Sequence, residues 1–379
     1  MVMHSLIVSA HRRTPDQDLD LSPFWEAVEF GPESVFHPWR MGEQTVELAA
    51  IFYTDVSVEK FLSGALKVLQ NDPQLSDVSC RRSQIEHTDI FDRPVIILSA
   101  PRAGSTLLWE TLAASSEVWT IGGESHHVME AFPELNTRER GYVSNRLVAE
   151  DLAPETADKL RAGFAGGLRN AKGRLLLATP RERQPDKLRF LEKTPKNALR
   201  LPFLHALFPE ARFIVLYRDP RENVSSLMEA WRLGGRHYRA FKSLPDWPAG
   251  ECWKKGEWRM LLPPGWPELR GCSLVEIAAF QWRQTYSVLL DDLARLPDEQ
   301  WCAVHYSDLL ADPAGEIRRL CRFADLRFDV HLQERVGSAL PRSRATLSAP
   351  EARKWKRNEE ELEPVLRELL DIYARLRKL

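Results

Sequence analysis

The chain has 379 residues with 44% hydrophobic and 28% charged residues, the balance of a globular protein with room for one large α/β domain or a domain with an appendage. The net charge of −2 argues against nucleic acid or an anionic membrane as the main partner, and no apolar run is long enough to span a membrane. The five cysteines are scattered without a C-x-x-C pair, so we expect reduced thiols in a cytoplasmic protein and neither a disulfide framework nor a metal site.

Residues 1–88 have a different pattern from the rest of the chain. Proline and acidic residues interrupt the stretch 14–40, and apolar residues at helical spacing from Phe61 to Leu69 predict one or two helices. The cluster Leu6-Ile7-Val8 is too short for the core of a signal peptide. We therefore predict a helical or irregular N-terminal region that either covers the main domain, residues 89–379, or mediates dimerisation.

The stretch Arg93–Ala113 reads as strand, tight loop and helix. Val95–Leu98 is a short apolar run typical of a parallel strand buried on both faces, and leucines at helical spacing follow from Leu107. The small residues between them place several unpaired backbone N–H groups at a helix N-terminus, which favours anion binding. The alternative is a tight strand-to-helix turn without a ligand.

The loop Pro101-Arg102-Ala103-Gly104-Ser105-Thr106 resembles a P-loop in plan but is not a Walker A sequence. Ser105 stands where a lysine should follow Gly104, and the cation comes earlier, at Arg102. This change weakens the case for ATP or GTP, whereas Arg102 still offers a two-pronged anion ligand. Ser105 and Thr106 can cap the helix or bind a phosphate.

A second short strand is predicted at Val118–Ile121. It is followed by Gly122-Gly123-Glu124-Ser125-His126-His127, at the edge of a parallel sheet where ligands bind. Glu124 and the two histidines are therefore candidate acid–base groups. The alternative is a glycine turn with a surface carboxylate.

The next strand is expected from Arg189, and it runs into a loop restricted by Pro195. Lys193 follows the end of this strand, next to the predicted sheet edge. The alternative for Lys193 is a solvated lysine, the usual environment of that residue.

A second strand–helix unit begins with the apolar run Phe213–Tyr217. Asp219 as N-cap, followed by proline and by Glu222 three residues after the cap, predicts a capping-box start. Arg218 closes the strand and Ser226 lies about two turns away, ~9 Å along the helix. Together they can bind a second phosphate. Pairing of Arg218 with Asp219 or Glu222 is the alternative.

The stretch of about 232–275 is rich in tryptophan, proline and glycine, with Trp247, Trp253, Trp258 and Trp266. We interpret it as an insertion that either shapes a substrate pocket or lid, or only packs. After it, the pattern predicts a helix over 274–293, a strand from Trp301 to Tyr306, a helix from Pro313 to Phe323 capped by Asp312, and a C-terminal helix.

In combination, the two anion sites, the arginine-bearing loop and Tyr306-Ser307-Asp308-Leu309 resemble the PAPS-dependent sulfotransferases over roughly residues 90–375. PAPS is 3′-phosphoadenosine 5′-phosphosulfate, the sulfuryl donor. The resemblance implies an α/β fold with three layers, a mostly parallel sheet flanked by helices, as in P-loop NTPases. Arg102 places the sequence with the bacterial and protein-tyrosine sulfotransferase-like branches rather than with the cytosolic hormone-and-phenol branch. The C-terminal glycine loop of that last branch is missing, and Arg353-Lys354-Trp355 is the candidate substitute.

The resemblance also implies a role for individual residues. The loop for the 5′-phosphosulfate corresponds to Arg102, Ala103, Gly104, Ser105 and Thr106. The pair for the 3′-phosphate corresponds to Arg218 and Ser226, and the aromatic position near the adenine corresponds to Tyr306. Lys193 corresponds to the lysine that neutralises the sulfuryl group or the bridging oxygen. Glu124 corresponds to the catalytic base, with His126 or His127 as the alternative base.

The function implied is in-line transfer of a sulfuryl group from PAPS to a hydroxyl of an unidentified small-molecule or carrier-bound acceptor, leaving 3′,5′-adenosine bisphosphate, without a metal. Two other functions stay open at this point. One is a P-loop small-molecule kinase that uses ATP with Mg²⁺, and the other is a non-catalytic nucleotide-binding scaffold.

Overall fold

The computed structural model describes residues 3–14, 18–28, 34–85, 89–233, 240–241, 244–247, 257–349, 351 and 353–379. The chain forms two compact units. The first comprises Met1–Asp92, Trp119–Glu139 and Leu152–Phe190, and the second comprises Arg93–Val118, Arg140–Asp151 and Leu191–Leu379. No helix among the described residues combines the length and the apolar character that a bilayer crossing needs.

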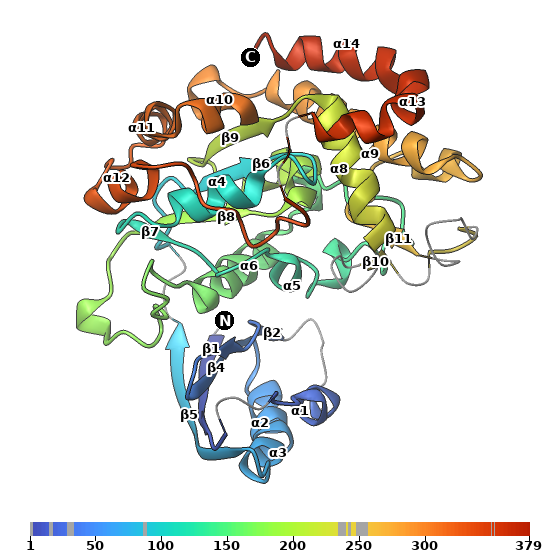
Figure 1. Ribbon diagram of the computed structural model, residues 1–379. Coiled ribbons are helices and arrows are strands. Elements are labelled where there is room, and N and C mark those ends of the chain that lie inside the picture. The colour runs from blue at the N-terminus through green and yellow to red at the C-terminus, as the bar shows by residue number, and fades with distance from the viewer. Residues whose placement is uncertain are drawn as a thin grey trace. The chain divides into compact units, whose positions relative to one another are not determined.

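A five-stranded sheet forms the centre of the second unit, in the order β12-β9-β6-β8-β7 (Figure 1). Its strands are β6 (Val95–Leu98), β7 (Val118–Trp119), β8 (Arg189–Lys193), β9 (Arg212–Tyr217) and β12 (Trp301–His305). β6 pairs in parallel with both β8 and β9, and β9 pairs in parallel with β12. The predicted α/β class with a mostly parallel sheet is therefore confirmed.

Helices cover this sheet and follow its strands. They are α4 (Ser105–Leu112), α7 (Leu201–Leu207), α8 (Pro220–Leu233), α9 (Leu274–Leu293), α10 (Tyr306–Ala311), α11 (Pro313–Phe323), α12 (Val330–Val336), α13 (Glu359–Leu362) and α14 (Leu366–Leu376). The helices expected over 274–293 and from Pro313 to Phe323 have the predicted bounds. Asp312 caps α11 as predicted, since its Oδ1 accepts a hydrogen bond from the amide of Gly315 at 2.9 Å.

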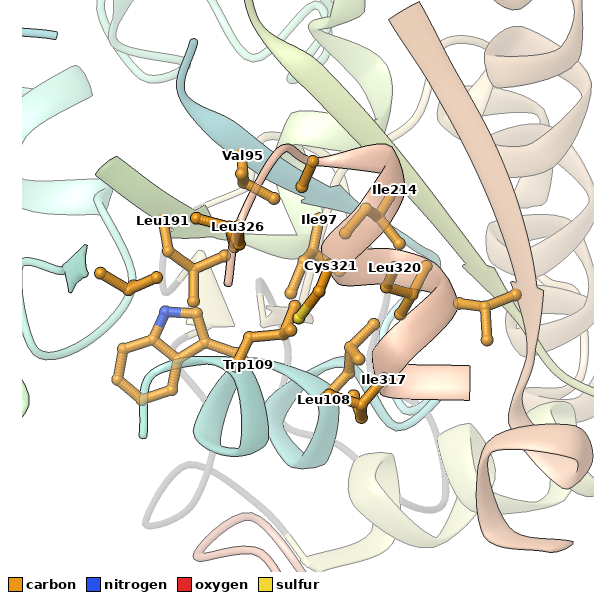
Figure 2. Packing of buried hydrophobic residues seen from close by; sticks show 14 of the residues in the cluster. Val95, Ile97, Leu108, Trp109, Leu191, Ile214, Ile317, Leu320, Cys321 and Leu326 are labelled. Carbon is orange, nitrogen blue, oxygen red and sulfur yellow. The ribbon is translucent and has the colours of Figure 1, made fainter. Parts of the chain in front are cut away.

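The sheet is buried on both faces, which gives the unit three layers. Figure 2 shows Ile97 of β6 and Ile214 of β9 packed with Leu108 of α4 and Leu320 of α11 on one face. Successive strand residues point to opposite faces, so the fully buried Phe213 belongs to the other face. The apolar runs of β6 and β9 suit strands of this kind, because helices cover both faces of the sheet.

The tryptophan-rich stretch packs against this unit. Trp247, Trp258 and Trp266 are buried and contact one another edge to face, with ring centroids 4.8 to 5.9 Å apart. Two short strands, β10 (Ala240–Phe241) and β11 (Trp258–Arg259), pair antiparallel there. Trp253 lies outside the described residues. For the three described tryptophans of the stretch, the structure favours the packing alternative.

The first unit contains an antiparallel sheet in the order β2-β4-β1-β5, with β3 paired to β4. Its elements are β1 (Met3–Arg12), α1 (Ser22–Ala27), β2 (Ser34–Phe36), β3 (Arg40–Met41), β4 (Thr45–Phe52), α2 (Asp55–Ser63), α3 (Ala65–Gln70), β5 (Leu75–Ile85), α5 (His126–Met129) and α6 (Pro154–Gly167). Buried residues of α1, α2 and α3 cluster with those of the sheet. Ile7 and Ala49 cluster with Leu175 instead.

The strands correct the prediction of a helical or irregular N-terminal region. The helices expected around Phe61–Leu69 are present as α2 and α3, but the same region also holds five strands. Most of β1 is buried, and its apolar run Leu6-Ile7-Val8 therefore lacks the alternation of a half-buried strand. A short continuous run of this kind cannot be assigned to strand or helix by periodicity alone.

Gln281 of α9 connects the tryptophan-rich stretch to the rest of the second unit. Its side-chain Nε2 donates to the carbonyls of Arg259 and Leu261 at 2.9 and 2.8 Å, and its Oε1 accepts from the indole of Trp231 at 2.9 Å. All of these atoms are buried, so Gln281→Met removes buried hydrogen bonds to Trp231, Arg259 and Leu261. We expect the free energy of unfolding, measured with urea, to fall by about 2 to 4 kcal/mol.

The matched control is Arg283→Met on the same helix, because Arg283 forms a surface ion pair with Glu368. We expect it to change the free energy of unfolding by about 0.5 kcal/mol or less. Equal losses in the two variants would contradict the role given to Gln281.

Candidate active site

The loop after β6 has a backbone that only certain residues can adopt. Arg102 and Gly104 have φ values of +66° and +105°, both in the left-handed region. A Cβ on Gly104 would stand 2.4 Å from the ring of Tyr306, so the position has no room for a side chain. The predicted strand, loop and helix are thus present, and the close approach of Tyr306 accounts for the glycine.

Backbone donors converge at the start of α4. The amide N–H groups of Gly104, Ser105 and Thr106 find no acceptor among the residues that the structure describes. The first turn of a helix leaves such donors unsatisfied, and they suit an anion. On the other side of the loop, the buried side chain of Asn223 donates to the carbonyl of Pro101 at 2.8 Å and holds the turn.

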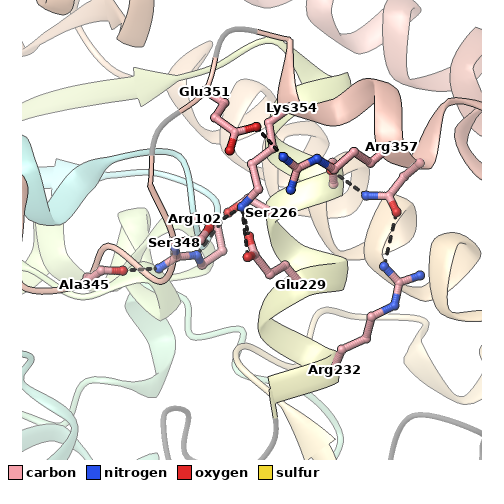
Figure 3. A network of polar contacts seen from close by, with 11 residues as sticks. Arg102, Ser226, Glu229, Arg232, Ala345, Ser348, Glu351, Lys354 and Arg357 are labelled. Atoms are coloured by element: carbon pink, nitrogen blue, oxygen red, sulfur yellow. Dashed lines mark hydrogen bonds and ion pairs between the residues drawn. The ribbon is translucent and has the colours of Figure 1, made fainter.

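Arg102 joins the two predicted anion sites. Its Nε donates to Oγ of Ser226 at 3.3 Å, and its Nη1 donates to the carbonyl of Ala345 at 2.9 Å. Figure 3 shows Arg102 between Ser226 of α8 and the chain segment of Ala345. The loop after β6 and the helix after β9 therefore meet at a single guanidinium.

Arg218 and Tyr306 form the second contact between these elements. The Cζ of Arg218 lies 4.7 Å from the ring centroid of Tyr306, and its Nε donates to Glu222 at 2.8 Å. The pairing with Glu222 is the alternative that the sequence left open for Arg218, and the structure shows it. Asp219 caps α8 as predicted, since it accepts a hydrogen bond from the amide of Arg221 at 2.9 Å, but Glu222 faces Arg218.

Lys193 is buried at the end of β8. Only 3% of its surface is exposed, and its Nζ donates to Oγ1 of Thr106 at 3.3 Å. It lies opposite Ile97 in the parallel pairing of β6 and β8, which brings it to the start of the loop. The alternative of a solvated lysine is therefore wrong.

Glu124 and His126 form a pair in the first unit. Oε2 of Glu124 is 2.9 Å from Nε2 of His126, and the two side chains are 36% and 19% exposed. Nδ1 of His126 lies 3.8 Å from Glu130. A half-exposed carboxylate beside an imidazole can accept a proton and share the resulting charge. His127 points elsewhere, since its Nε2 lies 3.0 Å from Nδ1 of His37.

A C-terminal segment runs beside α8. Lys354 binds Glu229 at 2.7 Å, and Nδ2 of Asn358 donates to Oγ of Ser225 at 2.7 Å (Figure 3). Burial raises the pKa of Glu229, but the hydrogen bonds and the charge of Lys354 outweigh it, so the pKa lies below its ordinary value. Glu229 is thus a carboxylate that fixes this segment, including the predicted Arg353-Lys354-Trp355, next to Ser226.

Sequence reasoning missed two parts of this arrangement. Asn223 gave a weak signal, because asparagine is a poor helix former in the first turn of a helix. Ala345 gave none, because it contributes only a backbone carbonyl. Within the described residues, no group of three or more His, Cys, Asp or Glu side chains is arranged to hold a metal ion.

Comparison with known proteins finds distant similarities. A protein of Caenorhabditis briggsae named "Putative protein-tyrosine sulfotransferase" is 23% identical to this chain over 266 residues. The aligned residues cover 69% of this chain and 77% of the relative. The chain is also similar to two solved structures. A Mycobacterium tuberculosis sulfotransferase has a TM-score of 0.41 at 16% identity and coverages of 74% and 78%. A mouse sulfotransferase complexed with PAP has a TM-score of 0.38 at 10% identity and coverages of 76% and 87%.

The family assignment rests on a match to a model of a protein family, and not on these distant structures. The model of the sulfotransferase family matches residues 94–262 and 268–330, and so takes in β6, β8, β9 and β12 with their loops. The match covers more than half of the 379 residues. The chain therefore belongs to the sulfotransferase family and is a PAPS-dependent sulfotransferase.

Proposed function

We propose that this enzyme transfers the sulfuryl group of PAPS to a hydroxyl of its acceptor, with Glu124 as the base. The observation that carries the proposal is the contact of Arg102 with Ser226, at 3.3 Å, which joins the loop after β6 to the helix after β9. A donor with a phosphosulfate at one end and a phosphate at the other needs two adjacent anion sites, and these two elements provide them.

The loop after β6 fits the 5′-phosphosulfate. Among the described residues, the amides of Gly104, Ser105 and Thr106 have no acceptor and are available to an anion, and Arg102 adds a fixed positive charge. Because Gly104 has no side chain, the ring of Tyr306 packs directly against the backbone of this loop. PAPS supplies an activated sulfuryl group, and these donors stabilise the charge that develops on the 5′-phosphate as it leaves.

The helix after β9 fits the 3′-phosphate. Nε of Arg218 is occupied by Glu222, but a guanidinium has five N–H donors, and its two terminal nitrogens are suited to a phosphate. Ser226 adds a hydroxyl two turns into α8, and Tyr306 presents an aromatic ring beside Arg218 for the adenine. We assign the segment that includes Lys354 to the closure of this side, because Glu229 fixes it beside Ser226.

Lys193 neutralises the transferring group. Its buried Nζ contacts Thr106 of the donor loop, so the positive charge is held at the place where the sulfuryl group changes partners. Sulfuryl transfer resembles phosphoryl transfer, in which positioning and electrostatic stabilisation supply most of the rate.

Glu124 removes the proton from the acceptor hydroxyl while the acceptor oxygen bonds to sulfur and the bond from sulfur to the 5′-phosphate oxygen breaks. The products are a sulfate ester and 3′,5′-adenosine bisphosphate. His126 lies 2.9 Å from the carboxylate, so it orients Glu124 and can take up the proton in turn. General base catalysis of this kind contributes roughly 10²–10⁴-fold to the rate.

The acceptor is a hydroxyl compound, either a small molecule or a carrier-bound chain. We place the reaction in the cytoplasm, because Cys80, Cys272, Cys302 and Cys321 are all free thiols.

Binding of the product tests the two anion sites. 3′,5′-Adenosine bisphosphate without metal, at about 100 times its dissociation constant, should stabilise the enzyme by about 2.7 kcal/mol, measured as a thermal shift. Arg102→Ala and Ser226→Ala should weaken binding, Arg102→Ala by roughly tenfold or more because it removes charge-assisted hydrogen bonds. Arg283→Ala is the control, since Arg283 forms a surface ion pair with Glu368. A shift only with ATP and Mg²⁺ would support a kinase instead.

Replacement of the base tests the chemistry. Glu124→Gln keeps the shape of the side chain but cannot accept a proton, so turnover should fall roughly 10²–10⁴-fold while binding of 3′,5′-adenosine bisphosphate stays unchanged. The measurement is transfer of radiolabelled sulfate from PAPS in a screen of hydroxylated compounds. Glu134→Gln serves as the control, because Glu134 binds Thr156. Full activity of Glu124→Gln would move the role to a histidine.

A further inference from the structure

A buried histidine of the first unit has both ring nitrogens engaged. His37 follows β2 and is 1% exposed. Its Nε2 lies 2.7 Å from the carbonyl of Gly163 in α6, and its Nδ1 lies 3.0 Å from Nε2 of His127. The two imidazole rings meet edge to face at a centroid distance of 4.9 Å. His37 therefore connects the N-terminal part of the chain to the residue next to His126.

The end of α6 is shaped around this imidazole. A Cβ on Gly167 would stand 2.1 Å from the His37 ring, and one on Gly166 would stand 2.4 Å from Ile51. Glycine in a helix costs about 1 kcal/mol relative to alanine, so the helix gives up intrinsic stability to admit the ring.

The hydrogen bonds fix where the protons are. A backbone carbonyl can only accept, so Nε2 of His37 carries the proton. Burial, and then the nearby charge of Arg169, outweigh the hydrogen bond to Gly163 and lower the pKa of His37 to about 4. Neutral His37 thus has its lone pair at Nδ1, and His127 must donate to it from Nε2.

His127 lies in α5, directly after the loop that carries the candidate base. Gly122 opens this loop with φ +79°, and Val128, which follows His127, packs 3.2 Å from the Cβ position of Gly163. The loop is thus attached to α6 and to His37 directly after the pair of Glu124 and His126.

We propose that His37 is a positioning residue for the sulfuryl transfer: it fixes the ring direction and the tautomer of His127, and so holds the loop with Glu124 and His126 in its working geometry. The proposal rests on the proposed role of Glu124. Under this proposal the N-terminal part of the chain supports the reaction itself. This role differs from the two hypotheses drawn from the sequence, covering the main domain and dimerisation.

The tautomers are measurable in the full-length enzyme without turnover. Selective ¹⁵N labelling of the histidines, with His37→Asn and His127→Asn for assignment, gives the protonation of each ring by NMR. At neutral pH we expect a proton at Nε2 of His37, a proton at Nε2 of His127 and none at Nδ1 of His37. The absence of a proton from Nε2 of His127, or a doubly protonated His37, would overturn the proposal.

Kinetics separate positioning from a structural role. His37→Leu removes both hydrogen bonds, and we expect kcat to fall on the order of 10²-fold, the cost of a small misplacement of catalytic groups, with KM for PAPS unchanged. His37→Asn keeps an acceptor for His127 and should restore kcat to within about tenfold of the natural enzyme. His4→Leu is the matched control, because His4 is a buried histidine of β1 that binds Asp55.

Equal losses of kcat in His37→Leu and His4→Leu, or no recovery in His37→Asn, would show that His37 only supports the fold and would overturn the proposal. Full activity of Glu124→Gln would instead overturn the proposed base, while the NMR measurement would still decide whether His37 and His127 are coupled. The two failures are therefore distinguishable.

Discussion

The parallel pairing of β6, β9 and β12 is the constraint on which the candidate active site depends. In this register Leu98 lies opposite Val215, and Tyr217 lies opposite His305, so the chain leaves all three strands at the same edge. The loop of Gly104, the side chain of Arg218 and the ring of Tyr306 are consequently neighbours, although they are far apart in sequence. The sheet thus brings these positions together, and the local sequence determines which side chains occupy them.

Some elements of the fold could be predicted from the sequence because a local residue pattern determines them. The buried runs of β6, β9 and β12 and the cap of Asp312 could be read directly, because each has a distinct residue pattern. The strands β1 and β4 could not be predicted in this way, because strands covered on both faces lose the alternation of apolar and polar residues. For the site, residue types at strand ends pointed to Arg102 and Lys193. The burial of Lys193 and the contacts of Asn223 and His37 depend on tertiary packing and leave little trace in sequence.

The cations of the candidate site interact with several parts of the chain. Arg102 donates to Oγ of Ser226 and to the carbonyl of Ala345, and its charge contributes to the lowered pKa of Glu229. Arg218 is paired with Glu222, and Lys354 is paired with Glu229 on the same helix. Carboxylates of α8 thus partly compensate the positive charges of the candidate site.

The glycines at the end of α6 have a consequence for attempts to stabilise the enzyme. Exchanging helical glycine for alanine is a common route to a higher melting temperature, because it limits the freedom of the unfolded chain. At Gly166 and Gly167 the added methyl group would instead collide with Ile51 and His37. Consensus or library designs for thermal tolerance should therefore leave this turn untouched and work on the exposed face of the helix.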